Sequence, residues 1–116
     1  MATWTMQLPA DLKAPAIARQ AVTERLSDCR RGVRRDAESV VSELVANAVR
    51  EGSSPMVLSI SEGGGRARIA LSGTGVGGGR LPEYWSERVI AGLARWGVWG
   101  DDAHVWFEVP MDRRVS

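Results

Sequence analysis

The segment "DAESVVSELVANAVREG" at residues 36–52 limits the possible folds of this chain more than any other feature. Its apolar side chains recur on one side of a helix: Ala37, Val40, Val41, Leu44, Val45 and Ala48. Gly52 stands where a glycine commonly ends a helix. A helix with a single apolar stripe has to bury that stripe against another element. We therefore expect a layered domain in which this helix is one of the packed elements.

Several short segments have the alternation or the apolar composition of strands, and turn residues separate them. The segments at 55–61 and 66–72 flank "EGGG" at 62–65 and are predicted to form a hairpin. The other expected strands are 3–8 ("TWTMQL") and a closing pair, "VWG" at 98–100 and "HVWFEVP" at 104–110, around the turn "DDA".

Two further segments show helical spacing. One begins at Ala14 and continues to about Cys29, and the other is part of 81–97. The predicted order is therefore β-α-α-β-β-α-β-β. This order predicts a two-layer α/β sandwich, with helices on one face of a mixed, mostly antiparallel sheet. The 116 residues fit a single domain, 1–116.

Composition excludes several classes of protein. Apolar residues make up 44% of the chain, which is enough for a core, so global disorder is not expected. The net charge of +1 argues against nucleic acid or a membrane as partner. We find neither a signal peptide nor a membrane-length apolar run, and we expect a cytoplasmic protein. The single cysteine, Cys29, is expected to be a small buried or half-buried thiol.

The sequence "RRGVRR" at 30–35 carries four arginines around Gly32. Two interpretations apply to it: a phosphate-binding patch, or a solvated turn between two helices. We favour the turn.

Glu43 and Asn47 are four residues apart on the strongest helix, so they lie on one side of it, beside Val40. Glutamate can act as a general base, and the asparagine carbonyl oxygen can bind Mg²⁺. Two polar residues at the margin of an amphipathic helix have the same pattern. The spacing alone favours this structural interpretation.

The segment "SELVANAVREGSSPMVLSI" resembles the N-box region of the GHKL ATPase superfamily, and within it the small bacterial anti-sigma-factor serine/threonine kinases. "ARWGVWGDDAHVWFEVP" is similar to the closing segment of that family. The resemblance implies a Bergerat-type fold that binds ATP and Mg²⁺. It implies that Glu43 is the catalytic base and that Asn47 is the Mg²⁺ ligand. Glu51 replaces the histidine that is usual in the family.

The glycine-rich loop "LSGTGVGGG" at 71–79 falls where the family has its D-x-G-x-G box. The resemblance implies nucleotide contacts for Gly73, Thr74, Gly75 and Gly77. Gly75 and Gly77 are kept, but Gly73 stands in place of the aspartate that accepts the adenine amino group. A charged hydrogen bond of this kind contributes on the order of 1.5–3 kcal/mol, so its loss weakens binding roughly 10- to 150-fold. Thr74 is the nearest hydroxyl.

A second departure concerns the phosphate contacts. Where the family has glycines whose backbone amides hold the phosphates, this chain has Tyr84, Trp85 and Ser86. Bulky side chains prevent the close approach of backbone that a phosphate needs. They are suited instead to filling an emptied nucleotide cleft.

Two functions therefore remain open. The first is a regulatory protein that keeps the scaffold, has weakened or lost nucleotide binding, and binds a protein partner. The resemblance implies a sigma factor or an anti-anti-sigma-like regulator as that partner, and a homodimer is consistent with it. The second is an active anti-sigma-factor serine/threonine kinase that uses Glu43, Asn47, Gly75 and Gly77. We favour the first, and so do not expect an enzyme. A module for another phosphate ligand is a third option that the glycine loop alone does not exclude.

Overall fold

The computed structural model describes residues 2–50, 56–72, 95–99 and 104–111. Its elements follow in the order β1 (Ala2–Leu8), α1 (Ala14–Arg25), α2 (Arg31–Arg50), β2 (Met56–Gly63), β3 (Arg66–Ser72), β4 (Arg95–Trp99) and β5 (His104–Pro110). The strands form one five-stranded sheet of order β1-β2-β3-β5-β4.

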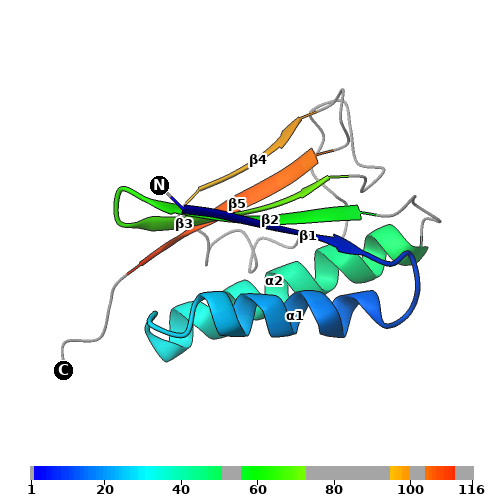
Figure 1. The fold of residues 1–116 in the computed structure, drawn as a ribbon, viewed down its shortest axis with the longest axis horizontal. Coiled ribbons are helices and arrows are strands. Elements are labelled where there is room, and N and C mark those ends of the chain that lie inside the picture. The colour runs from blue at the N-terminus through cyan, green and yellow to red at the C-terminus, as the bar shows by residue number, and fades with distance from the viewer. Residues whose placement is uncertain (1, 51–55, 73–94, 100–103, 112–116) are drawn as a thin grey trace.

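Both helices cover the same face of this sheet (Figure 1). The predicted two-layer α+β sandwich is therefore confirmed. The four described strand pairs are all antiparallel, so the parallel component of the expected mixed sheet is not found among the described strands.

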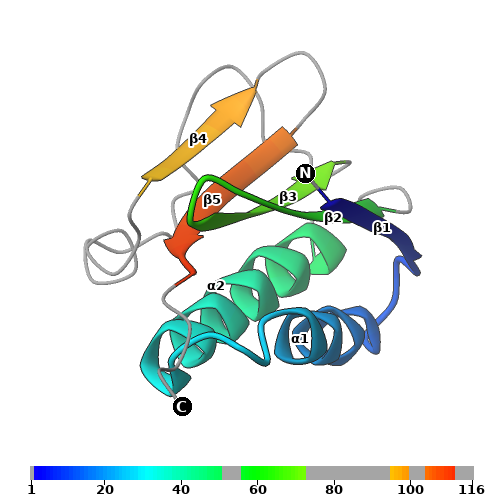
Figure 2. The ribbon, with the colours of Figure 1, turned by 60° about the vertical axis from the view of Figure 1, so that its left-hand side comes forward.

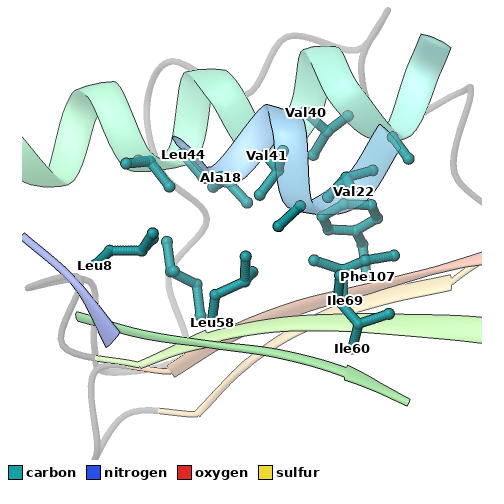
Figure 3. Packing of buried hydrophobic residues seen from close by; sticks show 14 of the residues in the cluster. Leu8, Ala18, Val22, Val40, Val41, Leu44, Leu58, Ile60, Ile69 and Phe107 are labelled. Atoms are coloured by element: carbon teal, nitrogen blue, oxygen red, sulfur yellow. The ribbon is translucent and has the colours of Figure 1, made fainter. Parts of the chain in front are cut away.

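The core lies between the helices and the sheet (Figure 3). Alternation decides which strand residues reach it, because antiparallel partners directly opposite each other share a face. The register aligns Leu58 with Leu71, and Ile60 with Ile69, which in turn faces Phe107. Across the core, α2 contributes the apolar stripe expected from the sequence, and each of its members is buried: Ala37, Val40, Val41, Leu44, Val45 and Ala48.

The β2–β3 hairpin turns at two glycines. Gly64 has φ of 60° and Gly65 has φ of 75°, a region that L-residues with a side chain rarely occupy. Two successive positive φ angles are typical of the tight turns whose twist matches that of antiparallel strands. The hairpin predicted from "EGGG" is therefore confirmed, with β2 extending to Gly63.

The bounds of the helices differ from those predicted. α2 begins at Arg31, so the interpretation of "RRGVRR" as an interhelical turn is wrong for residues 31–35. The backbone N–H of Arg34 donates to the Arg30 carbonyl at 3.0 Å, and Gly32 falls in the first turn of the helix. Backbone N–H groups in a first turn have no partner within the helix, so the cost of glycine there is small.

α1 ends at Arg25, four residues before the predicted end. The Leu26 N–H still donates to the Val22 carbonyl, and a turn then leads to Cys29. Cys29 is fully buried, as expected, and its thiol lies 3.1 Å from the Met111 sulfur.

The last predicted helix falls mostly outside the described residues, which omit 73–94. Residues 95–97 belong to β4, so the helical part expected within 81–97 does not include them, and this strand begins three residues before the predicted "VWG". There Arg95, Trp96 and Gly97 pair with Glu108, Phe107 and Trp106 of β5. Backbone pairing with β5 determines the strand conformation of residues 95–97, although the apolar spacing of the residues before them is typical of a helix.

Candidate functional site

One end of the sheet gathers the segments that the sequence analysis singled out. Val57, near the start of β2, pairs with Ser72, the last residue of β3. Leu71 of β3 pairs with Val105 of β5 at the same end. β3 is the central strand of the five, so the chain leaves the middle of the sheet immediately before Gly73.

The second half of α2 lies toward this end as well. The helix ends at Arg50 and β2 begins at Met56, so only a short connection joins them. Figure 1 shows the green end of α2 under the same end of the sheet at which β2 begins and β3 ends. Glu43 and Asn47, in this half of the helix, are therefore carried toward the end where the glycine-rich loop begins.

Glu43 is exposed on α2, next to the buried Leu44. An exposed carboxylate is hydrated and available to a ligand or to a water molecule. Asn47 belongs to the same helix, but its side chain lies outside what the structure describes. The same holds for all of Gly73, Thr74, Gly75 and Gly77, and for Tyr84 and Trp85. The roles that the resemblance implies for these residues remain predictions.

The face of the sheet opposite the helices carries a cluster that the sequence analysis did not single out. Glu108 of β5 is 7% exposed although it is charged. Its Oε2 accepts from Arg68 Nε at 2.9 Å and lies 2.8 Å from Arg68 Nη2. The Arg68 guanidinium also stacks 4.2 Å from the centre of the Trp106 ring. The antiparallel register of the structure places Arg68 directly opposite Glu108, and the sequence alone does not give this register.

A hollow of about 320 Å³ adjoins this cluster and is lined by Ser61, Glu62, Gly63, Arg66, Arg68 and Glu108. Two arginines and two glutamates balance in charge, and Arg66 lies 3.7 Å from Glu108. The hollow therefore favours neither an anionic nor a cationic ligand, and we interpret the cluster as a structural link between β3 and β5.

Within the described ranges, we find no group of three or more His, Cys, Asp or Glu side chains that could hold a metal ion. A Mg²⁺ site that relies on Asn47 would need the phosphates of a nucleotide as further ligands. None of the described helices is long and apolar enough to cross a membrane.

The fold places the chain in the class of α+β two-layer sandwiches with an antiparallel sheet. No protein-family model matches the chain, and no curated protein matches it. Among solved structures, it is similar to the crystal structure of the RsbU and RsbW domains of Rv1364c from Mycobacterium tuberculosis. The TM-score is 0.69 at 16% sequence identity, and the match covers 94% of this chain. It covers 31% of that chain, so the present chain spans about a third of that structure's length. At this identity the likeness concerns the fold.

Proposed function

We propose that this protein is a bacterial regulator with a GHKL-type fold of the anti-sigma-factor kind, which acts by binding a protein partner. The observation that carries this proposal is the fold: two helices on one face of an antiparallel sheet, similar over 94% of the chain to a structure that contains an RsbW domain. RsbW is a GHKL-type anti-sigma-factor kinase. The sequence resemblance to the same class supports the proposal from a separate source.

The second part of the proposal is that nucleotide binding is weakened or lost. It rests on Gly73, which follows the last residue of the central strand. A glycine there has no side chain to accept a hydrogen bond from the adenine amino group. Tyr84 and Trp85, at the positions expected for phosphate-binding glycines, support the same conclusion. The natural partners of such a regulator are a sigma factor or an anti-anti-sigma-like protein.

Restoration of the lost carboxylate tests why binding is weak. In equilibrium dialysis with Mg·ATP, we expect Gly73→Asp alone to stay as weak as the native chain, because Tyr84 and Trp85 still stand in the sequence where the resemblance implies phosphate-binding glycines. Gly73→Asp combined with Trp85→Gly should bind more tightly than either single variant. Tight binding by Gly73→Asp alone would contradict a role for the aromatic residues.

The partner is tested separately. The purified chain, mixed with purified sigma factors from its own source and with no nucleotide present, should form a stable complex that elutes as one species. If complexes form only when Mg·ATP is added, the partner-binding activity depends on nucleotide and the proposal fails.

An active serine/threonine kinase is the second candidate, and the exposure of Glu43 favours it. If Glu43 is the general base, Glu43→Ala should lower phosphate transfer to a partner serine by 10²-fold or more. Asp36→Ala, at another exposed acidic position of α2, is the matched control and should leave the rate unchanged. Equal rates for native chain and Glu43→Ala would exclude this role.

A further inference from the structure

The start of α2 carries two exposed arginines, Arg31 and Arg35, which we call the basic patch. They are four residues apart, so their side chains leave the same side of the helix. Within the described residues, neither guanidinium takes part in an ion pair, a ring contact or a hydrogen bond. Arg34 differs, because its Nη1 donates to the Ser27 carbonyl at 3.4 Å and its Nε lies 3.9 Å from Glu38 Oε2. The basic patch is therefore a pair of guanidinium groups that face solvent.

The basic patch lies apart from both the core and the proposed nucleotide site. Arg35 and the buried Leu44 are nine residues apart, which places them on opposite sides of α2 at about 100° per residue. Figure 2 shows the start of α2, in cyan, at the end of the helix layer beside the turn from α1. Position 47 is about 18 Å further along the same helix than position 35, at about 1.5 Å per residue. A ligand at the basic patch therefore lies away from Asn47.

The arrangement is unfavourable for the helix itself. Like charges four residues apart repel each other, and positive side chains in the first turn oppose the positive end of the helix dipole. The first turn of α2 contains no acidic residue to offset this effect. Asp28 and Asp36 are exposed and close in the sequence, but neither forms an ion pair with the basic patch in the described part of the chain. Residues that break a local rule are expected mainly at functional positions, so the basic patch points to a binding role.

We propose that the basic patch binds an acidic segment of a protein partner, with one carboxylate at each guanidinium. The proposal rests on the function proposed above, since it requires that the chain binds a protein. An arginine can donate two parallel N–H groups to one carboxylate, which fixes its orientation. Arg31 and Arg35 are one turn apart, about 6 Å along the helix axis, so carboxylates with a similar spacing on the partner fit both.

Nucleic acid fits the basic patch less well. A nucleic-acid site commonly offers several phosphate contacts along a continuous basic surface. Here only two solvent-facing arginines stand together, and Asp28 and Asp36 flank them in the sequence. The net charge of the chain is +1. A short segment with two carboxylates matches this charge distribution better than a phosphate backbone does.

Titration of the isotope-labelled full chain with a synthetic acidic peptide, followed by NMR, tests the site. The peptide is alanine-rich, carries glutamates four residues apart, and is about 16 residues long so that it can form a helix. At an ionic strength of about 0.02 M, we expect saturable shifts of the backbone signals of residues 31–35. At about 0.5 M these shifts should largely disappear, because salt screens exposed charges.

Variants of the basic patch test which side chains bind the peptide. Arg31→Glu should weaken binding by about tenfold or more, because the introduced carboxylate repels the peptide and pairs with Arg35 instead. Arg31→Lys keeps the charge and should keep most of the binding. Lys13→Glu is the matched control: it makes the same change in charge at an exposed position before α1, and it should bind as the native chain does.

Thermal unfolding separates a binding role from a structural one. Arg31→Glu removes the repulsion and places a negative charge at the positive end of the helix, so its melting temperature should rise by roughly 2–4 °C. A variant that binds the peptide as the native chain does, or that loses binding together with a lower melting temperature, would overturn the proposal. Shifts centred on another surface, or tighter binding of single-stranded DNA than of the peptide, would also overturn it.

Complex formation with the purified sigma factors keeps this proposal distinct from the proposed function. If the native chain and Arg31→Glu form the complex equally well, the proposed function stands and the role of the basic patch is wrong. If the native chain forms no complex while peptide binding still depends on Arg31, the sigma-factor proposal fails and the basic patch stands. Loss of the complex in Arg31→Glu but not in Lys13→Glu would support both.

Discussion

At the scale of single residues, the stability of this domain depends on side chains at the centre of the core. Leu58 of β2 is fully buried and faces the helices (Figure 3). We expect Leu58→Ala to lower the free energy of unfolding by about 2–5 kcal/mol, from lost burial and from the cavity that it leaves. Urea denaturation followed by circular dichroism measures this change.

Leu12 provides the control for Leu58, because it is 89% exposed. Leu12→Ala removes the same atoms from the surface and should change the free energy of unfolding by less than about 0.5 kcal/mol. Equal losses for the two variants would contradict the placement of the core.

The alternation of apolar and polar residues predicted the faces of β2 and β3, because a one-residue shift would bury polar side chains. Cys29 was also correctly expected to be buried. The burial of Glu108 was missed, since it depends on Arg68 of a strand about forty residues earlier in the sequence. The side chain of a single residue gives no indication of such a partner.

At the scale of elements, α1 and α2 are joined by a polar contact as well as by apolar packing. The Thr23 hydroxyl lies 2.6 Å from Glu38 Oε2 and 2.9 Å from the Arg19 carbonyl. A hydroxyl has one proton, and we assign it to the carboxylate, which is the closer and charged acceptor. This hydrogen bond therefore links the two helices.

Removal of this hydroxyl should weaken the link. Thr23→Val keeps the branched shape and loses the donor, and we expect it to lower the free energy of unfolding by about 1 kcal/mol. Thr23→Ser keeps the donor and should lose much less. Thermal or urea unfolding of the two variants compares them directly. A Thr23→Val variant as stable as the native chain would show that the contact contributes nothing.

The sequence predicted some of the helices and strands correctly and missed the bounds of others. The α2 stripe and the β2–β3 hairpin were predictable because periodicity and a glycine turn are local signals. The start of α2 was not, because the arginines and Gly32 in its first turn have no distinctive apolar spacing. The extent of β4 was missed because it is set by pairing with β5. Bounds that depend on a neighbouring strand cannot be obtained from the segment alone.

At the scale of the whole molecule, the likeness to the RsbU and RsbW domain structure at 16% identity shows that this fold tolerates extensive sequence change. The core positions are filled by interchangeable apolar residues, which keep the architecture as long as pattern and volume are kept. A ligand site is less tolerant, because it depends on particular side chains, and the aspartate that the resemblance implies at the position of Gly73 would be one of them. A fold of this kind can therefore persist while a ligand site on it changes, which is what the proposed loss of nucleotide binding requires.

Core positions tolerate substitution and ligand-binding positions do not, and this difference limits how much of the candidate site could be predicted from the sequence. The sequence placed Glu43 on α2, and the structure describes it there as exposed. The meeting of α2, β2 and β3 at one end of the sheet required the register and topology. The roles of Asn47 and the glycine loop remain predictions based on the resemblance.

Calorimetric titration of the native chain with ATP in the presence of Mg²⁺ tests the central claim most directly. We predict little or no heat of binding at nucleotide concentrations up to the millimolar range. A dissociation constant below roughly 100 μM, equivalent to binding stronger than about −5.5 kcal/mol, would contradict the claim that this regulator has lost effective nucleotide recognition.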